Sequence, residues 1–339
     1  MSIEPSSVLT SILYRAAAVA SSLARSGRAA GRLARFLALT RVLHNRLTGG
    51  STNDLIRGHL RRIFPELDSE GLESVIKGYW TKHQKNLVAL FHTRRLGRDD
   101  MPRVVRWRNR QLLDDALERG KGVLLLVPHY GDERTLHILL AMHGYPMHAI
   151  SSRYLDQPAF VRQAKLMVAR EWHHVAFPDQ SPRWMYRALG RGEIIHIAPT
   201  AYGGPGGTWI ESFGLPILTS STPYRLHKRT GCSLLVGTNT QLPRMRYQIE
   251  LERLEQPEDS RHLNRLTAEI AESKAREQPQ QYEWLHLVIR HRETNTIRRL
   301  GYVPRREQVL EAEAIPEDSS PGNIASMEEV LRALRHPEN

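Results

Sequence analysis

Cysteine is almost absent from the chain, since Cys232 is the only one among 339 residues. A single cysteine forms no internal disulfide, so nothing indicates an oxidising compartment and a reducing cytosol is the default. Long uncharged runs are missing too. A bilayer-spanning helix needs about 20 apolar residues, whereas the charge-free stretches 5–14 and 16–24 are divided by Arg15. A cleaved secretory signal is not indicated, because the apolar stretch is weak and no basic n-region precedes it.

Several motifs that would identify a catalytic, nucleotide-binding or metal site are also missing. The chain has no Gly-x-Ser-x-Gly, the strained turn that serine hydrolases use for their nucleophile. No Gly-Lys-Ser/Thr ends a phosphate-binding loop, and no Gly-x-Gly-x-x-Gly opens a helix. His143, His148 and the pair His173-His174 match no zinc template, so we expect no metal. Cys232 precedes an apolar run, which favours core packing over a nucleophilic role.

Acidic residues are scarce in the first third of the chain. Residues 1–110 hold 20 Lys+Arg and 8 Asp+Glu, whereas residues 111–339 hold 28 of each, so the whole net charge of +12 lies in the first third. Clustered cations favour a polyanionic neighbour, either nucleic acid or an anionic membrane surface. A solvated basic surface without a dedicated partner is the third alternative. The hydrophobic fraction of 40% and charged fraction of 25% are ordinary for a globular protein.

The start of this basic region is amphipathic if it is helical. Four arginines fall on one helix face: Arg25, Arg28, Arg32 and Arg35. Apolar residues fall on another: Leu23, Ala30, Leu33, Ala34 and Leu37. Such a helix suits a membrane interface, with its cations at the headgroups, although Phe36 falls on the basic side. Packing of the apolar face against the rest of the protein is an equal alternative.

The pattern along the chain predicts an α/β fold. Residues up to about 118 are expected to be helical, in stretches 6–47 and 52–92, with a break after Phe64-Pro65 and a restart at Asp68. Short apolar runs at 122–127, 147–151, 194–198 and 233–237 indicate buried parallel strands. Helical stretches at 135–143, 158–171, 182–190 and 222–230 separate them. We therefore expect a mostly parallel sheet flanked by helices.

The end of the chain adds an edge strand and a charged helix. Residues 247–254 alternate as an edge strand does, and residues 262–277 form a charged helix. Residues 303–339 are acidic and interrupted by prolines, which indicates a loosely attached tail. Three regions are thus expected: a basic helical N-terminal region (1–110), an α/β core (111–302) and the acidic tail (303–339).

The first candidate site is Pro128-His-Tyr-Gly-Asp-Glu-Arg134, where a predicted strand gives way to a helix. Ligands of open α/β sheets bind outside the carboxyl ends of the strands, so His129 has a favoured catalytic position. Its imidazole takes up a proton near neutral pH, and a carboxylate one helical turn away stabilises the charged form. Asp132 and Glu133 both lie within reach of the ring. The alternative is a purely structural His129 that caps the helix beside Asp132.

The second candidate is the glycine-rich stretch that runs from Ala198 to Pro216 and contains Thr200, Tyr202, Gly203 and Gly204. Glycines after a strand let the backbone approach a ligand closely, and Phe213-Gly-Leu-Pro is expected to line an apolar channel. The third candidate is the segment 277–292, where Trp-Leu-His precedes a basic cluster. Taken alone, that segment is either core followed by surface or a buried run with cations at an anion-facing edge.

Together these segments resemble the bacterial lipid A biosynthesis lauroyl/myristoyl acyltransferases, a branch of the lysophospholipid acyltransferase superfamily. The resemblance covers roughly residues 55–295. It rests on the order of Ile63-Phe-Pro-Glu-Leu, Leu-Leu-Val-Pro-His-Tyr-Gly, Arg191-Gly-Glu before Ile-Ala-Pro, Tyr-Gly-Gly-Pro, Phe213-Gly-Leu-Pro, Arg229-Thr-Gly-Cys and Gln281-Tyr-Glu-Trp-Leu-His.

The resemblance implies an acyltransferase with a helical, membrane-associating N-terminal part. His129 would be the general base that lets an acceptor attack the thioester of an acyl carrier protein or coenzyme A. The acceptor is expected to be a lipid, glycolipid or other amphiphile, and no cofactor is needed. Arg170 approximately matches a family arginine that meets a phosphate. The expected location is the cytoplasmic side of the inner membrane, held peripherally, with no nucleic acid as partner.

Two positions depart from the family pattern. The family has an acidic residue five positions after its histidine, where this chain has Arg134, and commonly an Asp where Thr200 stands. Either Glu133 or Asp132 supplies the carboxylate from a shifted position, or the chain keeps the fold without the standard chemistry. Arg134 either binds a phosphate or carboxylate of an unusual acceptor or is a solvated surface residue. A basic nucleic-acid-binding protein is the alternative from another class, although no recognisable module supports it.

Overall fold

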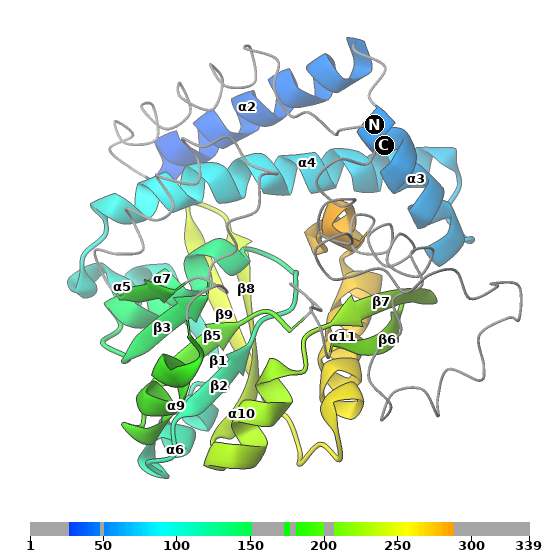
Figure 1. The fold of residues 1–339 in the computed structure, drawn as a ribbon. Helices are drawn as coiled ribbons and strands as arrows, with labels where there is room; N and C mark the ends of the chain where they lie inside the picture. Colours follow the sequence, from blue (N-terminus) through cyan, green and yellow to red (C-terminus); the bar gives the residue numbers. More distant parts are fainter. Residues whose placement is uncertain (1–26, 48–50, 151–172, 177–180, 200–206, 288–339) are drawn as a thin grey trace, which may run out of the picture.

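The computed structural model describes residues 27–47, 51–150, 173–176, 181–199 and 207–287. Seven strands form one sheet in the order β1-β9-β8-β2-β5-β3-β4 (Figure 1). In that order they span Val105–Arg108, Arg246–Arg253, Ser233–Leu242, Val123–Leu126, Ile194–Ile197, Met147–Ile150 and His174–Ala176. Neighbouring strands are parallel except β8 and β9, so the sheet is mostly parallel, as predicted.

Helices cover both faces of the sheet because its strands are apolar on both sides. In β2, Val123 and Leu125 belong to one hydrophobic cluster, and Leu124 and Leu126 belong to another. The first cluster includes α6 (Gln111–Glu118) and α7 (Glu133–Met142). The second includes α9, α10 and α11, which span Arg183–Gly190, Thr222–Thr230 and Ser260–Glu277. The predicted α/β architecture is therefore confirmed.

A layer of helices crosses the top of the sheet in Figure 1, where α2 (Gly27–Leu47) lies along α4 (Ser69–His92). The side chains of Ala30, Ala34 and Leu37 are buried in the cluster shared with α4. The packing alternative for the apolar face of α2 therefore holds for these residues. None of the described helices combines the length and apolar character needed to cross a bilayer.

The predicted break in the N-terminal helices is present. Helix α3 (Ser51–Ile63) ends just before Phe64-Pro65, and α4 begins after Asp68, whose side chain accepts a hydrogen bond from the Gly71 amide at 2.7 Å. This N-cap satisfies one of the amides that a helix start leaves without an intrahelical partner.

Three expectations were wrong or incomplete. The region up to residue 118 is not helical throughout, because β1 follows the short helix α5 (Met101–Val104). Strand β9 is not an edge strand, since β1 pairs with its other side. The stretch 207–219, where no strand was predicted, contains the hairpin of β6 (Thr208–Ser212) and β7 (Leu215–Thr219). The helices expected before residue 27 and at 158–171, and the tail 303–339, lie outside the described residues.

Candidate active site

The loop that carries His129 follows β2, the central strand of the sheet, at its carboxyl end. Neighbouring backbone holds it on two sides. The Gly131 amide donates to the Gln281 carbonyl at 2.8 Å, and the Glu283 amide donates to the His129 carbonyl at 2.9 Å. On the other side, the Asp132 amide donates to the Asn239 carbonyl of β8 at 2.6 Å. Hydrogen bonds from two distant segments therefore fix the position of the loop.

Gly131 is required for this arrangement. Its φ of +72° lies in the left-handed region, which side chains disfavour. A Cβ atom at this position would lie 2.1 Å from the Asn239 carbonyl oxygen. Only glycine therefore allows the loop to pass so close to β8.

His129 and Glu133 form a hydrogen-bonded pair. Helix α7 begins at Glu133, and the four-residue spacing brings the carboxylate under the ring, with His129 Nδ1 2.5 Å from Glu133 Oε2. A carboxylate accepts hydrogen bonds, so Nδ1 carries the proton and Nε2 is left with its lone pair. The side chain of His129 is 11% exposed, and Nε2 is buried and contacts no hydrogen-bond partner among the described residues. The pair thus has the geometry of a histidine general base whose charged form is stabilised by a carboxylate.

Asp132 has a different environment from Glu133. It is fully buried at the N-cap of α7, and its side chain makes no capping hydrogen bond. Burial raises the pKa of its carboxyl group to about 6. Burial, and then the negative charge of Asp132, raise the pKa of Tyr247. Of the two carboxylates in reach by sequence, Glu133 is therefore the one that pairs with His129, while Asp132 lies in the interior.

His286 was missed by the sequence reasoning. Its ring lies against that of His129 at a tilt of 39°, with centroids 3.6 Å apart. His286 follows the 3₁₀ turn η3 (Pro279–Gln281) and comes more than 150 residues after His129 along the chain. The signal that was available is its place in Gln281-Tyr-Glu-Trp-Leu-His, a segment that the resemblance already singled out.

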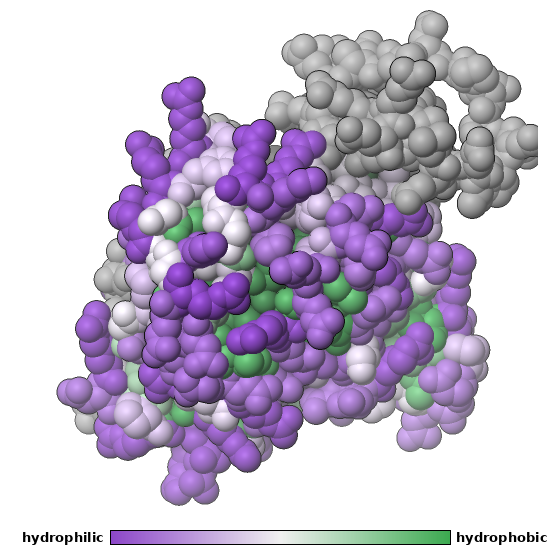
Figure 2. Space-filling model, turned by 90° about the horizontal axis from the view of Figure 1, so that it is seen from below, coloured by the Kyte–Doolittle hydropathy of each residue, from purple (hydrophilic) through white to green (hydrophobic). Residues whose placement is uncertain are grey.

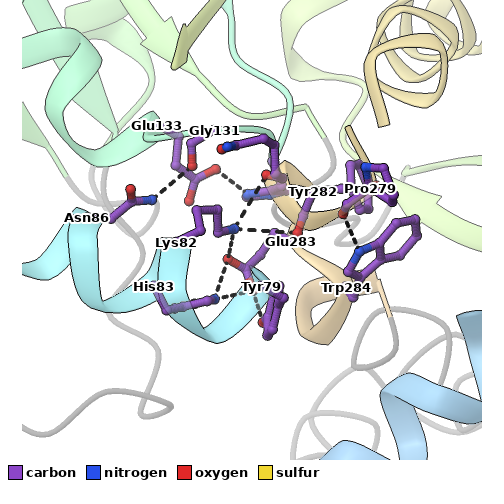
Figure 3. Close-up of polar contacts among 12 residues, drawn as sticks. Tyr79, Lys82, His83, Asn86, Gly131, Glu133, Pro279, Tyr282, Glu283 and Trp284 are labelled. Carbon is purple, nitrogen blue, oxygen red and sulfur yellow. Dashed lines mark hydrogen bonds and ion pairs between the residues drawn. The ribbon is translucent and has the colours of Figure 1, made fainter. Parts of the chain in front are cut away.

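A buried charged cluster adjoins the pair through Glu283 (Figure 3). Lys82 Nζ lies 3.2 Å from Glu283 Oε2, His83 Nε2 lies 3.0 Å from Oε1, and the Tyr79 hydroxyl donates a hydrogen bond to Oε1. Burial alone would raise the pKa of Glu283, but His83 and Lys82 hold it well below its ordinary value. Glu283 is therefore a carboxylate at neutral pH, and helix α4 supplies its partners.

Arg134 belongs to the surroundings of this cluster. It is partly buried, and its positive charge helps to lower the pKa of Glu283, whereas burial and Glu283 outweigh it and raise the pKa of Tyr79. It also acts on Asp132 in the same direction. The residue at the family's acidic position is thus placed near carboxylates rather than on a freely solvated surface.

Phe213 lies in a packed aromatic group. It is 6% exposed, and its ring centroid is 5.0 Å from that of Tyr282 and 5.2 Å from that of Trp284. Cys232 is buried at the start of β8, in agreement with a packing role. Four residues of the glycine-rich stretch and one arginine lie outside the described residues: Thr200, Tyr202, Gly203, Gly204 and Arg170. In the described ranges, no group of His, Cys, Asp and Glu side chains has the geometry of a metal site.

Comparison with known proteins places the chain in a family. A family model described as bacterial lipid A biosynthesis acyltransferase matches residues 29–290, which is more than half of the chain. The match contains the His129 loop, Glu133, the Glu283 cluster and His286. No curated protein matches the chain. The chain belongs to the bacterial lipid A biosynthesis acyltransferase family and is an acyltransferase that acts on lipid.

Proposed function

We propose that the protein moves a fatty acyl chain from the thioester of an acyl carrier protein or coenzyme A to a lipid, glycolipid or other amphiphilic acceptor, with His129 as the general base. The observation that carries this proposal is the pairing of His129 Nδ1 with Glu133 at 2.5 Å, which leaves Nε2 without a partner among the described residues. The position of His129 beyond the carboxyl end of the central strand supports the same role.

The proposed reaction has two steps. Nε2 takes the proton of the acceptor hydroxyl or amine as the acceptor oxygen or nitrogen attacks the thioester carbonyl. The tetrahedral intermediate then collapses, the carbon–sulfur bond breaks, and the leaving thiolate takes the proton back from the imidazolium of His129. The acyl group goes directly from sulfur to the acceptor, so no acyl-enzyme and no cofactor are needed.

Glu133 is proposed to assist by charge. The imidazolium that forms between the two steps is stabilised by a carboxylate on Nδ1, which also fixes the tautomer of the resting ring. Asp132 is the weaker candidate for this part, because its carboxyl group is buried near Tyr247 and its pKa is raised to about 6 by burial.

Substrate contacts are proposed for residues around this pair. Arg134 directly follows Glu133 at the start of α7 and is partly buried, and its guanidinium is proposed to meet a phosphate of donor or acceptor. Arg170 is proposed for a similar contact. The glycine-rich stretch with Thr200, Tyr202, Gly203 and Gly204 is proposed to approach the acyl donor, and Phe213 is proposed to line an apolar channel for the acyl chain.

An anionic membrane surface is proposed as partner of helix α2. Arg28, Arg32, Arg35, Phe36 and Leu39 fall within an arc of about 100° on one helix face. The three arginines are exposed, and so are Phe36 and Leu39, at 62% and 63%. Arginine at the headgroups with apolar side chains in the acyl region is the pattern of interfacial helices. Phe36 therefore fits this face.

The opposite side of the molecule has another character. Figure 2 shows it from below, where hydrophilic side chains dominate and apolar ones are visible mostly in the gaps between them. A protein held at the surface by α2 would turn this side towards water.

We propose that the protein is located on the cytoplasmic side of the inner membrane, where acyl thioesters are available. Flotation with anionic liposomes, set against a gel shift with random duplex DNA, separates this proposal from nucleic-acid binding.

Mass spectrometry of lipid extracts tests the function. Cells that carry the gene, cells that lack it and cells with the His129→Ala gene are compared. We expect an acylated lipid that appears only with the intact gene. The same product in cells that carry only His129→Ala would contradict the proposed mechanism, and identical extracts from all three would contradict the function. Assays with the two thioesters then identify the donor.

A further inference from the structure

We propose that Glu283 is a positioning residue for the reaction. Its carboxylate, held by α4, fixes the turn that places the ring of His286 against the ring of His129. This inference deepens the proposed function and rests on His129 as the general base. Glu283 acts through His286 and is not proposed to touch a substrate.

The backbone of Glu283 joins the His129 loop to the segment that carries His286. Its amide donates to the His129 carbonyl at 2.9 Å, and its carbonyl accepts from the Leu287 amide at 3.2 Å. The second hydrogen bond closes the helical turn of residues 284–287, on which His286 lies. The direction of this turn at Glu283 therefore determines how the two rings meet, with their centroids 3.6 Å apart.

The side chain of Glu283 is held from one face of α4 (Figure 3). Tyr79, Lys82 and His83 are spaced three and four residues from the first, so they share that face. The Tyr79 hydroxyl and His83 Nε2 donate to Oε1, the latter at 3.0 Å, and Lys82 Nζ donates to Oε2 at 3.2 Å. Three donors on one helix fix both oxygens of the carboxylate, whose side chain is only 16% exposed.

The negative charge of Glu283 is required as well as its hydrogen bonds. Lys82 is 5% exposed, and Glu283 is the carboxylate that pairs with it among the described residues. Lys82 Nζ also lies 3.4 and 3.5 Å from the carbonyl oxygens of Tyr282 and Gln281, so it ties three consecutive residues to α4. A neutral side chain at position 283 would leave a buried ammonium group without a countercharge. We expect Lys82 then to turn towards water and to release the segment.

Steady-state kinetics of Glu283→Gln test the proposal. Glutamine keeps an acceptor for Tyr79 and His83 but removes the charge opposite Lys82. We expect kcat to fall about tenfold, because the base is misplaced. The KM values for donor and acceptor should stay within about twofold of wild type, because the substrate contacts remain. Unchanged kcat, or a rise in KM alone, would overturn the proposal.

A double-variant cycle shows whether Glu283 acts through His286. If it does, adding Glu283→Gln to His286→Ala should lower kcat by less than about threefold further, since the ring that Glu283 places is already absent. Independent losses of about tenfold each would multiply to about a hundredfold. Such a multiplied loss is what a merely structural role of Glu283 predicts, and it would overturn the proposal.

The matched control is Glu193→Gln. Glu193 is likewise a partly buried carboxylate that pairs with a cation and a histidine, Arg191 and His148, each at 2.6 Å. It lies just before β5, at the opposite end of the sheet from His129, which follows the parallel strand β2. We expect kcat of this variant to stay within about twofold of wild type. An equal fall in the control would show that loss of any such ion pair slows the reaction, and would overturn the proposal.

A second variant keeps the test decisive if Glu283→Gln alone does not fold. Lys82→Met combined with Glu283→Gln leaves no buried ammonium group without a countercharge, so we expect it to fold, as circular dichroism would show. Its kcat should still be about tenfold below wild type, because the segment has lost its tie to α4. Wild-type kcat in this variant would overturn the proposal. Transfer by wild type and its loss in His129→Ala test the proposed function separately, so the two failures are distinguishable.

Discussion

The imidazole ring of His286 lies against that of His129, with ring centroids 3.6 Å apart and planes inclined by 39°. Glu133 holds the same ring through Nδ1. The ring is thus fixed at one face and at one nitrogen, and Nε2 is the atom left for chemistry. Orientation of a base within a few tenths of an ångström is what such supporting contacts provide.

Removal of the stacked ring should slow the reaction. In His286→Ala the His129 ring loses the contact at its face, so kcat is expected to fall about tenfold with little change in KM. His286→Phe restores a flat ring and should recover most of kcat. Steady-state kinetics of both variants check this. Equal rates for His286→Ala and wild type would show that the stack does not position the base.

The two neighbouring carboxylates should differ in their effect on catalysis. Glu133→Gln removes the charge that stabilises the imidazolium, so kcat should fall at least about a hundredfold. Asp132→Asn is the matched control, because Asp132 is buried near Tyr247. Its rate should stay within about fivefold of wild type at pH 7, where only small indirect effects are expected. The reverse order would assign the supporting acid to Asp132.

Asp132 should make the stability of the fold depend on pH. Burial raises the pKa of its carboxyl group to about 6 in the folded protein, from its ordinary value of 3.8. Between these values the unfolded chain ionises first, so the free energy of unfolding falls as pH rises from about 4 to about 6. The loss is at most about 3 kcal/mol.

Asp132→Asn has no proton to lose and should lack this decrease. Denaturant unfolding of wild type and variant at pH 4 and pH 7 measures the difference. The variant should gain stability relative to wild type at pH 7. The same change in the free energy of unfolding between pH 4 and pH 7 in the two proteins would show that the carboxyl group is not shielded from water.

The effect of the close backbone contact at Gly131 can be distinguished from the effect of a positive φ alone. Gly120→Ala places a side chain at φ +68° with nothing within 4 Å, and should lower the free energy of unfolding by only about 1–2 kcal/mol. Gly131→Ala meets the Asn239 carbonyl as well, and should cost at least about 3 kcal/mol and abolish transfer. Thermal unfolding and activity of both variants check this. Equal losses of stability in the two variants would mean that β8 shifts to make room for the added methyl group.

The buried strands were predictable because their sequences are continuous apolar runs. β2, β3 and β5 were found within one or two residues of the predicted bounds. β9 was found as a strand but misplaced at an edge. Its alternation arises because one face of the strand is buried in the core, whereas the other face is half-exposed and carries Glu250 and Glu252, which pair with Lys274 of α11 at 3.2 and 3.0 Å. The β6–β7 hairpin was missed because the glycines before it dominated the local pattern.

The site was predictable where it is local. His129 and Glu133 are four residues apart at a helix start, and that spacing alone brings them together. His286 comes more than 150 residues after His129, and the partners of Glu283 on α4 come 200 to 204 residues before Glu283. No periodicity records such contacts, so only the folded arrangement shows them.

Acyl transfer by purified His129→Ala tests the central claim most directly. Wild type and variant are incubated with an acyl carrier protein thioester, or an acyl coenzyme A, and a bacterial lipid extract, and the acylated lipid is measured by mass spectrometry. Circular dichroism confirms that the variant is folded. The proposed mechanism predicts product with wild type and none above background with His129→Ala. Product formation by the folded variant at the wild-type rate would contradict it.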